Sequence, residues 1–309
     1  MSLYKGKDPA RRHRKGAPPS RPAPGSAPRS EPREPRPRQE LKYYGVACCL
    51  ALWQQRPQDV IRIYVTEQSC KQFGAMLKWA AAQRLAYHLV PEEDLQRLTE
   101  SIHHQGICVL AREPVACEFA QLHSALASRD GPHLLGYLDG VENPHNLGAV
   151  VRSCAHFGVE YLLGEQGRLP RMSPSACRIA EGGAEHVQLV LLQDRDVELN
   201  ALHAQGFQLI AAGADGEPLY DQPLPARSVL VMGAEGGGVS SGLRARADRI
   251  VAIPGSGQVE SLNVSVAFAV IAAEYTRQRL QRPRSDSRSD SRYGGRPAVR
   301  PSNRNGARR

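Results

Sequence analysis

Short apolar runs alternate with amphipathic segments along residues 41–280, and this alternation predicts a protein of the α/β class. The runs at Val60–Thr66 and Leu134–Asp139 are typical of buried strands, whereas Cys70–Arg84 carries Phe, Leu and Ala residues at helical spacing. Because strand and helix follow each other throughout, we expect a mostly parallel sheet with helices on both faces in the larger part of the chain.

The apolar pattern is interrupted at both ends and once in the middle, so we divide the chain of 309 residues into five segments. They are a basic tail (1–40), a small α/β domain (41–112), a linker (113–132), a larger α/β domain (133–280) and a second basic tail (281–309). The expected strands are Val60–Thr66, Ala86–Val90, Gly106–Ala111, Leu134–Asp139, Tyr161–Leu163, Val187–Leu192, Phe207–Ala212, Ser228–Met232 and Arg249–Ile253. The expected helices are Tyr43–Gln55, Cys70–Arg84, one that begins at Pro91, Phe119–Ala127, Asn146–Phe157, Ala176–Glu181, Asp194–Ala204 and Leu262–Arg279.

The formal charge of +9 lies on the two tails. Residues 1–40 contain 11 Lys/Arg and 4 Asp/Glu, residues 281–309 contain 9 Arg and 2 Asp, and the body between them therefore has 20 basic and 25 acidic residues. Both tails are poor in apolar residues, so we expect them to be disordered. Arg-rich arms bind polyanions by releasing counterions, and this favours nucleic-acid binding over a role in solubility alone.

The sequence also excludes several functional classes. The basic start is followed by prolines and not by an apolar core, so it is not a signal peptide, and no apolar run approaches the roughly 18 residues of a membrane span. None of the seven cysteines forms a Cys-x-x-Cys pair or completes a zinc-binding spacing with histidine. We therefore predict a cytoplasmic protein with buried, reduced thiols and no metal site.

Three junctions between an apolar run and a polar loop carry the candidate chemistry, at 134–152, 229–241 and 253–267. Parallel strands present their carboxyl ends at one edge of a sheet, so the three loops can converge on one crevice, where open α/β sheets place their ligands. Such a crevice would suit a polar substrate and the movement of a proton. The polar side chains on offer are Asn146, Arg152, Glu235, Ser261 and Asn263.

Each of these residues also has a purely structural interpretation. Asn146, Ser261 and Asn263 can cap helices, and Arg152 can form a surface ion pair. The run 233–238 lacks the Lys-Ser/Thr ending of a nucleoside-triphosphate loop, and no G-x-G-x-x-G follows the first strand. Recurrence at three similar junctions nevertheless favours a shared site, in which the glycines bring the backbone close to a flat ligand.

The three segments closely resemble the signature motifs of the SpoU (TrmH-like) family of RNA 2′-O-ribose methyltransferases, in the SPOUT superfamily. The matching stretches are Asn143–Arg152, Val231–Val239 and Ile253–Ala267, in the family's order and spacing. In addition, Arg152–Val159 and Ala180–Val187 resemble the YfiF-type subgroup.

This resemblance implies a trefoil-knot methyltransferase domain that binds S-adenosylmethionine, a homodimer with the site near the subunit interface, and a small N-terminal substrate-binding domain. It implies that Gly233, Ile253 and Leu262 bind the methyl donor, largely through backbone groups. It places Asn146, Glu235, Ser261 and Asn263 at the polar end of the pocket, and it makes Arg152 the activator of the ribose 2′-OH. Because a guanidinium holds its proton tightly, the alternative for Arg152 is to clamp the adjacent phosphate and stabilise the developing alkoxide.

Two functions therefore stay open at the level of sequence. The first is an enzyme that methylates a ribose 2′-OH in structured tRNA or rRNA, and the alternative is a catalytically silent RNA-binding or ribosome-assembly factor with the same fold. The intact motifs favour the enzyme. Because the motifs build the donor site, we expect the small domain to choose the RNA, with single-stranded loops as targets. We expect most aromatic residues of that domain in its core, so that shape and phosphate contacts matter more than base stacking.

Overall fold

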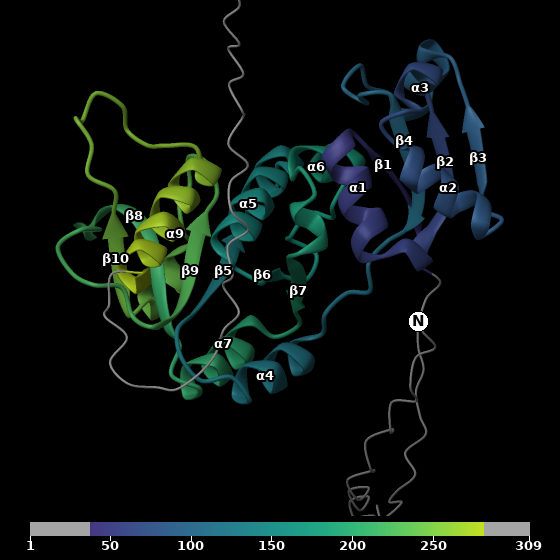
Figure 1. The fold of residues 1–309 in the computed structure, drawn as a ribbon. Helices are drawn as coiled ribbons and strands as arrows, with labels where there is room; N and C mark the ends of the chain where they lie inside the picture. The colour runs from purple at the N-terminus through teal and green to yellow at the C-terminus, as the bar shows by residue number, and fades with distance from the viewer. Residues whose placement is uncertain (1–37, 281–309) are drawn as a thin grey trace, which may run out of the picture. The chain divides into compact units, whose positions relative to one another are not determined.

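The computed structural model describes residues 38–280 (Figure 1). Residues 1–37 and 281–309 of the two predicted tails lie outside the described residues, so the predicted disorder and nucleic-acid binding of these segments stay predictions. Residues 38–40, predicted as the end of the first tail, are part of the fold: Arg38 pairs with Asp59 at 2.5 Å, and Glu40 begins the first strand. The described part contains two sheets, one of four strands in the N-terminal part and one of six strands in the C-terminal part.

The N-terminal sheet is mixed and has the strand order β1-β4-β2-β3. Strand β4 pairs antiparallel with β1 and β2, and β3 lies parallel to β2 at the edge. Two helices, α1 and α2, pack on one face, while α3 covers part of the other through Leu95. The elements are β1 (Glu40–Tyr44), α1 (Val46–Gln55), η1 (Pro57–Asp59), β2 (Val60–Val65), η2 (Glu67–Ser69), α2 (Gly74–Ala82), β3 (Ala86–Leu89), α3 (Glu92–Thr99) and β4 (Ile107–Arg112).

The predicted helix at Tyr43–Gln55 is wrong at its start. Tyr43 and Tyr44 end β1, and the helix begins only after Gly45, whose φ of +91° turns the chain. An apolar run alone does not distinguish a buried strand from a helix, and here the pairing of β1 with β4 decides. The helix predicted from Cys70 likewise begins later, at Gly74.

The C-terminal sheet has the strand order β10-β8-β9-β5-β6-β7, and all its pairs are parallel, as the alternation of strand and helix predicted. The short helix α8 was not predicted. The trefoil knot stays a prediction. The elements are α4 (Phe119–Ala127), β5 (His133–Asp139), α5 (Pro144–Phe157), β6 (Tyr161–Glu165), α6 (Pro174–Ile179), η3 (Gly183–Glu185), β7 (Gln188–Leu192), α7 (Arg195–Ala204), β8 (Gln208–Pro218), β9 (Arg227–Gly233), α8 (Ser241–Arg246), β10 (Arg249–Ala252) and α9 (Val264–Leu280).

Helices cover both faces of this sheet (Figure 1). Leu147 of α5 and Phe268 of α9 belong to the core on one face, and α4, α7 and α8 contribute Leu122, Leu199 and Leu243 to the core on the other. Each of these five side chains is at most 1% exposed. Because both faces of the sheet are buried, the strands consist of continuous apolar runs. Polar residues are therefore found in the loops at the ends of the strands.

All seven cysteines are free, and burial raises the pKa of the Cys108 and Cys177 thiols to about 12. Among residues 38–280 there is no group of three or more His, Cys, Asp or Glu side chains that could hold a metal ion. No helix in that same range is long and apolar enough to cross a membrane.

Candidate functional site

The site is built where the central strands β5 and β9 end side by side. Their parallel register places Asp139 opposite Gly233, so the loops that follow both strands leave the sheet at the same edge. After β5, the Asn143 side chain accepts a hydrogen bond from the backbone N–H of His145 at 2.9 Å, and this cap begins α5. The cap puts Asn146 in the first turn of the helix, beside the loop that follows β9.

Three polar side chains, one from each predicted motif, meet at this edge. The Asn146 Nδ2 and the Asn263 Nδ2 each donate a hydrogen bond to the same oxygen, Glu235 Oε1, at 2.8 Å. The Asn263 Nδ2 also donates to Asn146 Oδ1 at 3.1 Å. The predicted convergence of the three junctions is therefore present for these three residues.

The cluster is held in place by the helices that follow the loops. Asn146 is 8% exposed, although it is polar. The Asn263 Oδ1 accepts hydrogen bonds from the Ser265 backbone N–H at 2.9 Å and from the Ser265 hydroxyl at 2.6 Å, at the start of α9. In both asparagine side chains, the carboxamide nitrogen and the carboxamide oxygen are therefore each held by a hydrogen bond. The second oxygen of Glu235, Oε2, bonds to no residue in the described part of the chain.

Glycines shape the loop between β9 and α8. A Cβ on Gly233 would lie 1.9 Å from the Gly238 carbonyl carbon, so only glycine allows the backbone to close on itself here. Residues Ala234 and Gly238 form an antiparallel bridge, and Gly238 has a φ of +62°. The result is a tight loop of exposed peptide groups beside Glu235.

Asp139 is a site residue that the sequence analysis missed. Its side chain is 5% exposed, and its Oδ2 accepts a hydrogen bond from the Ser240 backbone N–H at 2.7 Å. This bond ties the end of the glycine loop to the end of β5. The sequence did contain a signal for Asp139, an acidic residue at the end of an apolar strand. A carboxylate buried there needs a hydrogen-bond donor nearby.

Arg152 does not join the cluster within one chain. It lies six residues after Asn146, so its side chain leaves α5 about 240° further around the helix. Its Cα lies on the side of Gly183, where an added Cβ would be 3.2 Å away. The Arg152 side chain is exposed and bonds to none of the residues 38–280.

The other predicted residues lie on or beside the loop between β10 and α9. Ile253 is half-buried and packs against the same core as α5 and α9. Ser261 and Leu262 are exposed, and Ser261 has no hydrogen-bond partner within the described residues. These residues share a loop with Asn263 but make no direct contact that fixes their roles.

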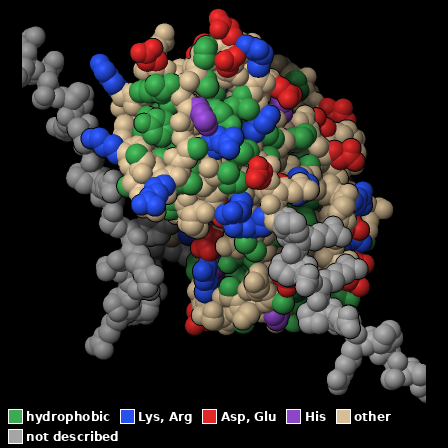
Figure 2. Space-filling view, turned by 90° about the vertical axis from the view of Figure 1, so that its right-hand side faces the viewer, with side chains coloured by type: hydrophobic (Ala, Val, Ile, Leu, Met, Phe, Trp, Pro, Cys, Tyr) green, Lys and Arg blue, Asp and Glu red, His purple; other side chains and the backbone are tan. Residues whose placement is uncertain are grey.

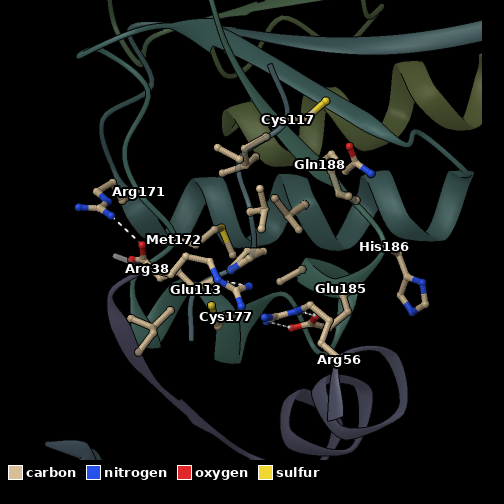
Figure 3. Close-up of a pocket in the computed structure, with 18 of the residues that line it drawn as sticks. Arg38, Arg56, Glu113, Cys117, Arg171, Met172, Cys177, Glu185, His186 and Gln188 are labelled. Carbon is tan, nitrogen blue, oxygen red and sulfur yellow. Dashed lines mark hydrogen bonds and ion pairs between the residues drawn. The ribbon is translucent and has the colours of Figure 1, made fainter. Parts of the chain in front are cut away.

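A cavity of about 850 Å³ lies away from this cluster, between the segment that follows β4 and the strands β6 and β7 (Figure 3). Its lining includes none of the predicted site residues. Arg171 pairs with Glu113 at 2.7 Å and Arg56 pairs with Glu185 at 2.6 Å, as the dashed lines show. Because its buried charges are already paired and much of the remaining lining is apolar, we assign no substrate to it.

Arg56, which lines this cavity, binds two carboxylates at once. Its Nε and a terminal nitrogen bind both oxygens of Glu185, and the other terminal nitrogen binds Asp59 Oδ2 at 2.8 Å. Burial lowers the pKa of Arg56, but the bonds to Glu185 outweigh burial and hold that pKa well above its usual value. These bonds connect η3 to the end of α1.

Replacing Arg56 by alanine should lower the free energy of unfolding by about 3–5 kcal/mol, because the Glu185 side chain, 3% exposed, would keep its charge without a partner. Urea denaturation measures this. Arg171→Ala is the matched control, since that arginine is 68% exposed and its pair with Glu113 should contribute at most about 1 kcal/mol. Equal losses in the two variants would show that Arg56 is not a structural ion pair of this kind.

Known proteins resemble this chain in sequence and in fold. Residues 133–273 match the profile of the SpoU rRNA methylase family, and residues 43–115 match that of RNA 2′-O ribose methyltransferase substrate binding. An uncharacterized tRNA/rRNA methyltransferase of Escherichia coli O157:H7, YfiF, is 36% identical over 78% of this chain and 69% of its own length. The chain belongs to the SpoU family of RNA methyltransferases.

Other relatives of this SpoU family member support the assignment. The 23S rRNA (guanosine-2′-O-)-methyltransferase RlmB of Coxiella burnetii is 31% identical over 76% of this chain and 95% of its own. A crystal structure of an RNA 2′-O ribose methyltransferase matches at 25% identity with a TM-score of 0.65, over 79% of this chain and 90% of that one. AviRb of Streptomyces viridochromogenes, in complex with AdoMet, shares the fold at 20% identity and a TM-score of 0.65, over 78% of this chain and 91% of that one. The predicted family and α/β fold class are confirmed.

Proposed function

We propose that this SpoU family member transfers a methyl group from S-adenosylmethionine to a ribose 2′-OH of tRNA or rRNA. The observation that carries the proposal is the cluster of Asn146, Glu235 and Asn263, in which three motifs distant in sequence meet through bonds of 2.8 to 3.1 Å beside a glycine loop. In this assignment residues 133–280 perform the chemistry and residues 41–112 select the RNA.

The glycine loop fits the methyl donor. At Gly233 the backbone of Gly238 already occupies the space that a Cβ would need. Cβ atoms on Gly236 and Gly237 would meet no atom within 4 Å, so the loop is open at these two residues and can lie against a flat ligand there. Gly233, Ile253 and Leu262 would hold the donor, largely through backbone groups. When bound, the donor supplies an activated methyl group on a sulfonium sulfur.

The residues of the chain would then align the reacting atoms and control one proton. The two carboxamides fix Glu235, and Glu235 Oε2 is left to orient a bound hydroxyl or amine. Transfer would form an oxygen–methyl bond and break the sulfur–methyl bond, leaving the donor as a neutral thioether, and the 2′-OH would release its proton to solvent water. Arg152, which stays protonated, would clamp the adjacent phosphate and stabilise the developing alkoxide.

We also propose that the chain acts as a homodimer, because Arg152 needs a second chain to reach the chemistry. Leu262 and Val266, at the site and the start of α9, are 45% and 47% exposed, and Val259 in the same loop is 71% exposed. Burial of these apolar side chains against a second copy would stabilise the pair. Arg152 of one protomer would then serve the cluster of the other.

The direct test is transfer of a labelled methyl group from S-adenosylmethionine to bulk rRNA and tRNA by the purified protein. A methylated 2′-oxygen blocks alkaline cleavage, so the label should appear in alkali-resistant dinucleotides. Asn263→Ala should lose most of this label, because the cluster loses the donor that bridges Asn146 and Glu235. Absence of both transfer and donor binding in the wild type would favour the catalytically silent RNA-binding factor instead.

Deleting residues 1–37 and 281–309, the parts of the tails outside the described fold, should weaken RNA association and flatten its dependence on salt, while donor affinity stays unchanged. The deleted segments carry a formal +7 each, from 10 basic and 3 acidic residues in the first and from 9 Arg and 2 Asp in the second, so they should supply the long-range attraction. Titration of RNA at several salt concentrations measures the slope. An unchanged slope in the truncated protein would assign the attraction to the body.

A further inference from the structure

One face of the N-terminal sheet is only partly covered. Pairing places Lys42, Leu110, Arg62 and Ala86 in one row across the four strands, and the next row holds Tyr44, Cys108, Tyr64 and His88. Helix α3 covers the second row at Tyr44 and Cys108, which are buried with Leu95. The part of the face that lies over β2 and β3 stays open, since Arg62, Ala86 and His88 are exposed.

Two aromatic rings lie on this open part. The rings of Tyr64 and His88 stack with centroids 5.4 Å apart and planes inclined by 24°. They are direct neighbours on β2 and β3, so the backbone register fixes the pair. Tyr64 is half-buried against the cluster around Leu95, whereas His88 is exposed. The stack is therefore anchored at Tyr64 and open at His88.

One cation, Arg62, borders the stack, and two more lie further along the same face of the sheet. The Arg62 guanidinium donates a hydrogen bond to the Tyr64 hydroxyl at 3.4 Å, and Lys42 lies on the same row as Arg62. Arg112 and Glu40 form the next pair of neighbours on β4 and β1. Three cations thus face one carboxylate on these strands. Figure 2 shows this domain in its upper half, where Lys and Arg side chains lie near a histidine among hydrophobic side chains, with Asp and Glu side chains above them and to the right.

We propose that this open face, defined by Arg62, Tyr64 and His88, is a stacking surface for a single-stranded RNA segment. An exposed ring offers its face to any unpaired base, and neighbouring cations neutralise the phosphates. A duplex hides its bases and could use only the cations. The inference rests on the proposed function, because it takes the N-terminal domain to bind the RNA that the cluster methylates.

The test measures binding of the full chain to fluorescein-labelled oligouridine by fluorescence anisotropy at several salt concentrations. His88→Ala should weaken binding at least about fivefold, and His88→Phe should restore it, because phenylalanine keeps an aromatic face. Arg62→Gln should reduce the slope of log affinity against log salt by about 0.7, the value of one phosphate contact on a single strand. Lys78→Gln, an equal charge change on α2 at the other face, is the control and should change neither quantity.

Unchanged affinity in both His88→Ala and Arg62→Gln would overturn the surface. Equal losses for oligouridine and for an RNA duplex would also overturn it, since stacking would then play no part. A change of oligomeric state in His88→Ala, seen by light scattering, would identify a protein interface instead. Methyl transfer by the wild type is measured separately. If transfer occurs but His88→Ala binds RNA normally, only the proposed stacking surface is contradicted. If transfer does not occur, the proposed function is contradicted.

Discussion

Substituting Arg152 by alanine should lower methyl transfer at least about a hundredfold and leave donor affinity unchanged, because the arginine stabilises charge that develops only during the reaction. Arg152 bonds to none of the residues 38–280, so its removal breaks no described contact. Arg152→Lys keeps the charge but loses the bidentate geometry for a phosphate, and it should retain a measurable fraction of the rate. Initial rates of the wild type and both variants at saturating methyl donor, measured across pH, distinguish a phosphate clamp from a proton acceptor as the role of Arg152.

Mixing two inactive variants tests whether Arg152 acts across the dimer. When Arg152→Ala and Asn263→Ala protomers are combined at random, half of the dimers contain one of each, and one of their two sites is intact. About a quarter of the wild-type rate should return if each site takes Arg152 from one chain and Asn263 from the other. No recovery after verified subunit exchange would place both residues in the same chain. Full activity of both Arg152 variants would remove Arg152 from the chemistry altogether.

Gly233→Ala should lose donor binding by more than about tenfold and destabilise the C-terminal domain by about 1–3 kcal/mol. The new Cβ would lie 1.9 Å from the Gly238 carbonyl carbon and 2.1 Å from the Val239 nitrogen, both backbone atoms that cannot turn away. The loop would have to open, and the peptide groups beside Glu235 would move with it. Isothermal titration with S-adenosylmethionine and urea denaturation measure the two effects.

Gly237→Ala is the matched control in the same loop. Its Cβ would meet no atom within 4 Å, and its φ is not in the left-handed region, so the substitution should be nearly neutral for stability. Comparable stability losses in the two variants would mean that the loop is sensitive to any side chain. Normal donor binding by Gly233→Ala would contradict the proposed role of the close approach between Gly233 and Gly238.

The sequence was sufficient to predict that three motifs converge, because parallel strands end at one edge and local patterns mark those ends. It was not sufficient for Arg152. The resemblance placed Arg152 in the same pocket as Asn146, but the helical turn directs its side chain about 240° away, and only the packing against Gly183 shows which side that is. Asp139 was missed because its partner, the Ser240 backbone N–H, lies 101 residues away in sequence.

The N-terminal domain was less predictable for the same reason. Most aromatic residues of this domain were expected in its core; Tyr43 and Tyr44 are indeed buried, whereas Tyr87 is 43% exposed. The stack of Tyr64 on His88 depends on the parallel register of β2 and β3, a pairing that joins strands more than twenty residues apart. Register follows from packing across the whole sheet, so no local pattern could reveal it.

The central claim, that this chain methylates a ribose 2′-OH in cellular RNA, is tested most directly by mapping 2′-O-methyl sites in rRNA and tRNA from cells with and without the protein. The account predicts that at least one nucleotide loses its methyl group in the deletion strain. The methyl group should return when the wild-type chain is supplied, and it should not return with Arg152→Ala. If no 2′-O-methyl site changes under any growth condition, the claim is contradicted.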